Sequence, residues 1–431
     1  MKTLFIHFFI YYSVFLLFED NYALFMLSNI AFFMHSMLIF RKALGNNLVS
    51  ILIALIIISL PISFKSISGV PFEQLPISWY MIFLSLIISV LFISASLIPK
   101  NKLAFNSVSM VAAVVLIYIF VPMLNSIDIF EGIKQVLGYT LFFVTLIFIP
   151  NINIPYKYKE YLKELYITSV LALSLVVIFQ ALLHRNGISI GNTLLLGGER
   201  YATGYLFSDY SFLALYLVSP IYFIFFKEIK IWIKFNMLFV ILSASFLTTA
   251  RTGVIAVVIC MLVFLIIYSL RNAIIKTPKV MVIWIAFLVV CALLINMLSM
   301  IRSEDILSSS GRYDGYIIAL RMWFDSFFLG IGFDMNSYKS ILGIAMPHNF
   351  VIQLLLQGGI VYFILIVTLF FLIFVKSYSL DKNSIWTLLL IIIGSQFIPD
   401  ILDSRYLLVL ILLVSLKNMN KSQNKVKLKE V

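Results

Sequence analysis

Long apolar runs, separated by short polar segments, recur along the whole 431-residue chain. Most runs approach the roughly 20 helical residues needed to cross a hydrocarbon core about 30 Å thick. The pattern predicts fourteen spans, at residues 4–18, 22–40, 48–64, 77–98, 105–124, 132–150, 162–184, 206–226, 232–250, 252–270, 279–301, 347–375, 384–399 and 403–417. The last two are short and could form a hairpin of re-entrant helices.

The residues inside these runs indicate helices. Backbone N–H and C=O groups in lipid must find partners within the protein, so spans are α-helices or strands of a closed barrel. The polar and apolar alternation typical of barrel strands is absent from the runs. We therefore expect an all-α polytopic integral membrane protein with about 12–14 transmembrane helices, and a single membrane domain covering residues 1–431.

Two polar segments are longer than simple turns. Residues 185–205 are rich in Gly, Ser, Thr and Asn, and residues 302–346 form the longest segment outside the spans. Within the second segment, the stretch "YDGYIIALRMWFDSFFLGIG" has apolar residues at helical spacing with Asp and Arg between them. This predicts an amphipathic helix lying on the outer membrane face, with Ser308–Ser310 and Gly311 capping its start.

Composition supports the membrane assignment. The chain is 62% hydrophobic and only 12% charged, with a mean hydropathy of +1.08. A soluble protein of this composition could not cover its surface with polar groups. The first apolar run is followed by Glu19 and Asp20 and then by another span, so we expect it to be a transmembrane helix and not a cleaved signal peptide.

Basic residues divide the loops into two sets. Of the 31 lysines and arginines, 21 fall in one set of alternate loops and at the two ends of the chain, and 19 of these are lysine. By the positive-inside rule this side is cytoplasmic, with both termini inside. The net charge of +12 therefore records orientation and requires no nucleic acid partner. Residues 418–431 are predicted to be a basic cytoplasmic tail beside anionic membrane lipid.

The opposite side carries mainly arginine. Its ten basic residues are Lys65, Lys134, Arg185, Arg200, Arg251, Arg302, Arg312, Arg321, Lys339 and Arg405. Arginine binds phosphate or carboxylate bidentately, so arginines gathered on the side where positive charge is disfavoured indicate a bound anion. The alternative is that single arginines pair with nearby acids, which are Glu199, Glu304, Asp305, Asp314 and Asp325.

Two residues on this side are candidates for chemistry. Arg251 joins two spans with almost no loop, at a depth where a charge is costly unless it is paired or faces a polar cavity; the alternative is that it snorkels to lipid headgroups. His348, in "MPHNF", lies where the long loop re-enters the membrane, and a neutral imidazole there could accept a proton. The alternative is a structural histidine at a helix start, capped by local hydrogen bonds. In the functional interpretation, Pro347 sets the first helical turn, with His348 just behind it at the interface.

Several motifs that would indicate other chemistry are missing. The chain has no Asp-x-Asp pair, no His/Cys cluster with metal-ligand spacing, no phosphate-binding glycine motif and no nucleophile elbow. No metal and no cofactor are expected.

Four segments, in order, resemble one known family. They are "ERYATGYLFSDYSFLALYL" (199–217), "TTARTGVIAVV" (248–258), "SSGRYDGYIIALRMWFDSFFLGIGFDMN" (309–336) and "PHNFVIQLLLQGGIVYF" (347–363). In this order they resemble the O-antigen polymerase/O-antigen ligase superfamily of bacterial envelope enzymes. The resemblance implies a metal-independent, GT-C-like glycosyltransferase of the bacterial inner (cytoplasmic) membrane that acts on polyprenyl-diphosphate-linked glycans.

The resemblance also implies roles for particular residues. Arg200 and Arg251 would hold the donor diphosphate, and Arg312 would support phosphate or sugar. His348 would be the general base or orient the acceptor, and Asn349 would position it. Arg302 and Arg321 are expected to support the site.

Within the superfamily, we expect a polymerase that joins undecaprenyl-diphosphate-linked repeat units into O-antigen or capsular polysaccharide. The Ile, Phe, Lys and Asn bias suggests an AT-rich gene, as is common in polysaccharide gene clusters. One alternative is a ligase that transfers glycan to lipid A-core. Another, from a different class, is a flippase for lipid-linked oligosaccharides, which would place paired charges deep in the membrane. Expected partners are membrane lipids and a chain-length regulator and flippase of the same pathway.

Overall fold

The structure is a computed structural model, and it describes residues 1–64, 78–97, 104–196, 200–272, 284, 285, 287–289, 292, 296, 312–334 and 347–418. The helices are α1 (Lys2–Phe18), α2 (Tyr22–Leu44), α3 (Leu48–Ser59), α4 (Trp79–Leu97), α5 (Ser107–Tyr118), α6 (Phe120–Met123), α7 (Ile129–Phe148), α8 (Tyr156–Arg185), α9 (Tyr210–Val218), α10 (Ile221–Phe225), α11 (Ile231–Leu247), α12 (Arg251–Asn272), α14 (Arg312–Asp325), α16 (Phe350–Leu380), α17 (Ile385–Ser395) and α18 (Arg405–Ser415). Two short 3₁₀ turns, η1 (Ile149–Asn151) and η2 (Ile401–Asp403), follow α7 and precede α18. The strands are β1 (Asn153–Ile154), β2 (Asn192–Leu196), β3 (Arg200–Tyr205) and β4 (Lys417–Asn418).

The predicted fold class is confirmed. Within the described residues, five helices are long and apolar enough to cross a membrane: Tyr22–Leu44, Ile129–Asn151, Tyr156–Arg185, Arg251–Leu270 and Phe350–Leu380. Eight shorter apolar helices accompany them, and together they coincide with thirteen of the fourteen predicted spans. The remaining span, 279–301, lies almost entirely outside the described residues. The chain is a polytopic α-helical membrane protein.

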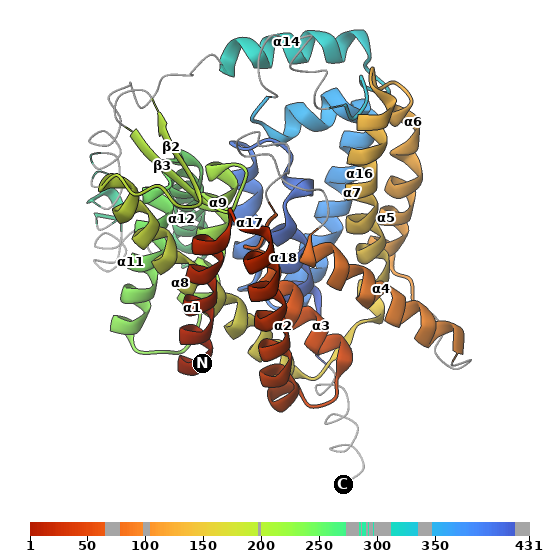
Figure 1. Cartoon of the computed structure of the whole chain (residues 1–431). Helices are drawn as coiled ribbons and strands as arrows, with labels where there is room; N and C mark the ends of the chain where they lie inside the picture. Colours follow the sequence, from red (N-terminus) through yellow and green to blue (C-terminus); the bar gives the residue numbers. More distant parts are fainter. Residues whose placement is uncertain are drawn as a thin grey trace.

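The helices form a bundle with two distinguishable ends (Figure 1). Helix α14 lies across one end, and the N-terminus of α1 lies at the other. We call these the α14 end and the N-terminal end. The hairpin of β2 and β3 lies near the α14 end, within the 185–205 segment for which the sequence predicted no strands.

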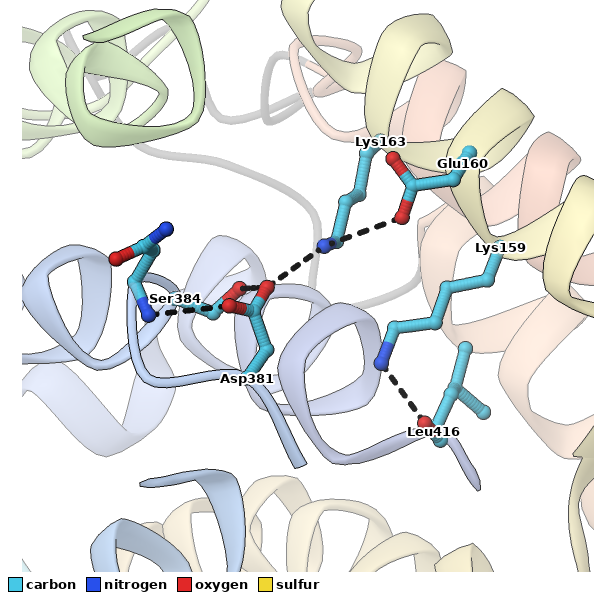
Figure 2. Close-up of polar contacts among 7 residues, drawn as sticks. Lys159, Glu160, Lys163, Asp381, Ser384 and Leu416 are labelled. Atoms are coloured by element: carbon cyan, nitrogen blue, oxygen red, sulfur yellow. Dashed lines mark hydrogen bonds and ion pairs between the residues drawn. The ribbon is translucent and has the colours of Figure 1, made fainter. Parts of the chain in front are cut away.

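A polar clamp holds the N-terminal end together (Figure 2). Its members come from the first turns of α8 and from the turns that follow α16 and α18. Lys163 pairs with Asp381 at 3.1 Å and with Glu160 at 3.4 Å. The Lys159 ammonium donates to the Leu416 carbonyl at 2.8 Å.

Asp381 is the acidic centre of the clamp. Its partial burial acts to raise the carboxyl pKa, but hydrogen bonds from Ser384 and Asn383 and the Lys163 charge outweigh burial, so the pKa is lowered. Hydrogen bonds and an opposite charge favour the ionised form. The clamp therefore joins α8 to the turns that follow α16 and α18, and the Asp381 carboxylate at its centre is ionised at neutral pH.

Helix α16 is broken in its interior. Gly359 has φ 69° and ψ −170°, which no residue of a regular helix adopts. The segment that follows α14 lies against the break: Ile331 N donates to Leu356 O at 2.8 Å, Gly332 N to Gln357 O at 3.1 Å, and Ile360 N to Phe327 O at 2.9 Å. Irregular backbone inside a membrane protein is tolerated where the protein itself supplies the missing partners.

Helix α14 packs on the part of α16 that precedes the break. Its buried Ala319 meets Leu356, with Ile318, Met322, Trp323 and Ile352 packed around them. Tyr313, Arg321, Phe324 and Asp325 on other faces of α14 are exposed. This one-sided burial confirms the amphipathic helix predicted inside 302–346, while Ser308–Ser310 and Gly311 lie outside the described residues.

Candidate functional site

His348 and Asn349 immediately precede α16, at the α14 end. The Asn349 side chain accepts a hydrogen bond from Ile352 N at 3.1 Å, so Asn349 is the N-cap and the helix begins at Phe350. The expectation that Pro347 sets the first helical turn is therefore wrong, because both Pro347 and His348 precede the cap. His348 is half-buried, and its carbonyl accepts from the Tyr316 hydroxyl of α14 at 3.0 Å. Helix α14 thus fixes the backbone at His348.

Arg251 begins α12, and only three residues separate it from the end of α11, as predicted from the lack of a loop. The turn before it is tight: Thr249 has a positive φ of 61°, and Ala250 N donates to the Thr248 hydroxyl at 3.2 Å. A Cβ on Gly253 would lie 2.7 Å from Ala214 O, so α12 and α9 approach closely just beyond Arg251. Arg251 is half-buried, and the tight turn and the close contact between α12 and α9 fix the position of its backbone.

The position of Arg251 is not explained by helix stability. The N-terminus of a helix carries partial positive charge, so a cation there is disfavoured and an anion is favoured. A guanidinium at the start of the 22-residue α12 adds to that positive potential. The arrangement suits an anionic ligand.

The other predicted arginines are distributed over the same end. Arg200 starts β3, opposite Leu196 in the hairpin register, and Arg312 starts α14. Arg321 is exposed on α14, and Arg302 lies outside the described residues. Arg251 starts α12 and His348 immediately precedes the Asn349 cap of α16, and both α12 and α16 pack against α17.

A buried polar network lies close to these helix starts, and the sequence analysis missed it. Asp400, in the turn between α17 and α18, is 4% exposed and has a left-handed backbone with φ 39°. Its carboxylate accepts from the Tyr139 hydroxyl and from the Gln135 amide at 2.8 Å, and its N–H donates to the Gln353 side chain. A buried carboxylate is costly in a membrane protein unless donors surround it, as they do here. The network ties α7, the first part of α16 and the α17–α18 turn together.

A cavity of about 680 Å³ lies beside this network. Its walls come from α7, from the segments flanking α3 and α4, from the start of α9 and from the α17–α18 turn. Asp403, Arg405, Lys134 and Gln135 are its charged and amide-bearing lining residues. Arg405 was counted among the ten basic residues of the outer side, but no site was assigned to it. The sequence signal was "PDILDSR", two carboxylates and an arginine between two short apolar runs.

A second, smaller cavity of about 300 Å³ lies at the N-terminal end, within the polar clamp. Most of its charged residues are paired: Lys163 with Asp381 and Glu160, and Lys227 with Glu164 at 2.9 Å. Lys159 donates instead to the Leu416 carbonyl. Charges satisfied by one another favour a structural role for this cavity. Among the residues that the structure describes, no group of three or more His, Cys, Asp or Glu side chains could hold a metal ion.

The fold and these helix starts define the class of a polytopic membrane protein with arginines at the starts of elements at one end. Residues 235–367 match the family model described as O-antigen ligase, and the matched stretch includes α12, α14 and the start of α16. The predicted resemblance to the O-antigen polymerase/O-antigen ligase superfamily is confirmed. No match was found among curated proteins. Arg251, Arg312, Arg321, His348 and Asn349 lie within the matched residues, whereas Arg200 and Arg405 lie outside them.

Proposed function

We propose that this protein polymerises undecaprenyl-diphosphate-linked repeat units into O-antigen or capsular polysaccharide, at the outer face of the inner membrane. The observation that carries the proposal is that the family-matched residues include both Arg251 and His348, each at the start of a helix that packs against α17. The α14 end is then the periplasmic face.

The reaction is an inverting glycosyl transfer without a metal ion. An acceptor hydroxyl attacks the anomeric carbon of the donor glycan, the bond from that carbon to the diphosphate oxygen breaks, and undecaprenyl diphosphate leaves. Arg251 and the N-terminus of α12 stabilise the negative charge that builds on the leaving group. Arg200 and Arg312 bind the same diphosphate or its sugar. His348 takes the proton of the acceptor hydroxyl, and Asn349 fixes the helix start behind it.

A deletion strain tests the proposal against its alternatives. Loss of a polymerase leaves single repeat units on lipid A-core, because ligation of one unit still proceeds. Loss of a ligase strands full-length polymer on the lipid carrier, and loss of a flippase gives no exported repeat. Gel analysis of surface polysaccharide, with the plasmid-borne gene as control, distinguishes the three. Stranded polymer would favour the ligase, the activity named in the family description.

The proposed orientation makes its own prediction. In a variant in which Cys260 and Cys291 are replaced by Ala, a cysteine at Tyr313 should react with a membrane-impermeant maleimide in intact cells. A cysteine at Tyr156 should react only after lysis. The two tyrosines are 64% and 50% exposed and begin helices at opposite ends of the bundle. The reverse pattern would contradict the assignment of the α14 end to the periplasm.

A further inference from the structure

The 680 Å³ cavity beside Asp400 combines an apolar wall with a cationic end. Phe130, Lys134, Leu137 and Leu141 line it from α7, at a spacing that places them on one face of that helix. Phe130 is 80% exposed and Leu137 is 60% exposed, although both are apolar. An apolar face left open on a membrane helix is suited to a hydrocarbon chain.

Arg405 supplies the buried part of the cationic end. Its Nη1 donates to the Ile62 carbonyl and to the Ser63 hydroxyl, each at 3.0 Å, and these bonds fix the guanidinium plane. Neither acceptor is charged, so neither neutralises the cation. With the described residues, Nε and Nη2 make no hydrogen bond. The Asp403 carboxylate is close enough for its charge to act on Arg405, but it makes no ion pair with the guanidinium. Three N–H donors of a fixed cation therefore remain for a ligand.

The remaining polar groups suit a sugar next to a phosphate. The exposed Asp403 carboxylate accepts no hydrogen bond from the described residues, and it lies near the surface of α7, where a Cβ on Gly138 would be 3.7 Å from Oδ1. Gln135 and Ser208 line the same cavity. A carboxylate accepts hydroxyl hydrogens, and an arginine fork binds phosphate oxygens. Lys134 is paired with Glu131 at 3.4 Å, so the charged groups of this cavity that make no ion pair with the described residues are Arg405 and Asp403.

We propose that this cavity binds a second polyprenyl-diphosphate-linked glycan, the acceptor. Arg405 and Lys134 bind its phosphates, Asp403 binds a sugar hydroxyl, and the α7 face lies along the polyprenyl chain. The inference rests on the proposed polymerase function, because a polymerase joins two lipid-linked substrates and must hold both at once. The buried network connects the sites: Asp400 is three residues from Asp403 and bonds to Gln353, one turn beyond the Asn349 cap.

The test counts bound lipid. The full chain is reconstituted in nanodiscs, undecaprenyl diphosphate is added as the probe, and native mass spectrometry counts the molecules bound. The wild-type protein should bind two. Arg405→Gln should bind one, with affinity at the lost site reduced about tenfold or more. Arg251→Gln should also bind one, and the double variant none. Inorganic diphosphate serves as the control for the polyprenyl chain. If that chain contributes to binding, inorganic diphosphate at the same concentration should displace neither lipid molecule. Displacement would overturn the proposal that the cavity binds a lipid.

Two further variants keep the test decisive. Gly138→Leu fills the cavity but leaves the Arg405 bonds to Ile62 and Ser63 intact, so it should also bind one lipid even if Arg405→Gln fails to fold. Arg41→Gln, an exposed arginine at the end of α2, should still bind two. Binding of only one lipid by the wild type, or of two by Gly138→Leu, would overturn the inference. Neither result would contradict the proposed polymerase function, because that proposal is tested by the polysaccharide phenotype of the deletion strain.

Discussion

Replacing Arg251 with Gln is expected to abolish long-chain polysaccharide and to lower the polymerisation rate about 10²–10³-fold. Removal of one donor that stabilises a developing oxyanion typically has an effect of this size. Here the loss should reach the upper part of that range, because the guanidinium acts together with the positive end of α12 and no metal ion is invoked in the reaction. Glutamine keeps N–H donors on a polar side chain and removes the charge.

The measurement combines a gel of surface polysaccharide with a rate for the purified variant on a lipid-linked repeat unit. Arg185→Gln is the matched control, since Arg185 is exposed in the last turn of α8 and has no assigned role in the site. It should leave the ladder unchanged. Wild-type ladders from Arg251→Gln at normal expression would exclude this residue from the donor site.

His348→Ala should also remove the long chains, for a separate reason. A positioned general base contributes about 10²–10⁴-fold. The variant should still bind as many molecules of undecaprenyl diphosphate as the wild type does, whereas Arg251→Gln should bind one fewer. A variant that loses lipid binding together with polymerisation would show that His348 acts in substrate binding or folding and not as a base.

The sequence predicts the membrane architecture well because span length and apolar character are local properties. Thirteen predicted spans coincide with helices, and α14 appears where apolar residues recur at helical spacing. Arg251 and His348 could be located for the same reason, since each lies where an apolar run begins. Their positions follow from the boundary between polar and apolar residues.

The buried network could not be predicted in this way. Tyr139 and Asp400 are 261 residues apart, and neither lies in a sequence motif that predicts a contact with the other. Arg405 looked like any arginine at the start of a short span, and only the packing of the α17–α18 turn against α3 and α7 places it in a cavity. Tertiary contacts of this kind leave no periodic signal in a single sequence.

The break in α16 was also missed, although "QGG" marks it. The apolar run 347–375 is continuous, and continuous runs predict continuous helices. The structure divides it at Gly359. His348 therefore precedes a short helical segment that begins after the Asn349 cap and ends at the break. The segment 327–332, after α14, occupies the space that the break opens.

Gly359→Ala should therefore be among the most damaging substitutions of a single small residue in this protein. The backbone conformation of Gly359 is almost exclusive to glycine and costs an alanine about 1–3 kcal/mol. A Cβ on Gly359 would also lie only 2.2 Å from the Phe328 carbonyl oxygen. Overpacking adds about 1–3 kcal/mol when neither side can move. Backbone hydrogen bonds hold both sides here, so we expect a total loss of about 3 kcal/mol, together with loss of long-chain polymer as the start of α16 shifts.

Gly187→Ala separates the two contributions. Gly187 has φ +83°, and no atom lies within 4 Å of an added Cβ. An alanine there is therefore destabilised by its backbone conformation but not by a steric clash. Thermal unfolding midpoints of both purified variants, in the same detergent, should show a clearly larger drop for Gly359→Ala. Equal drops would mean that the segment 327–332 yields to the new methyl group. In that case its hydrogen bonds to α16 would not be what holds the broken helix, and His348 would depend on α14 and Tyr316 alone for its position.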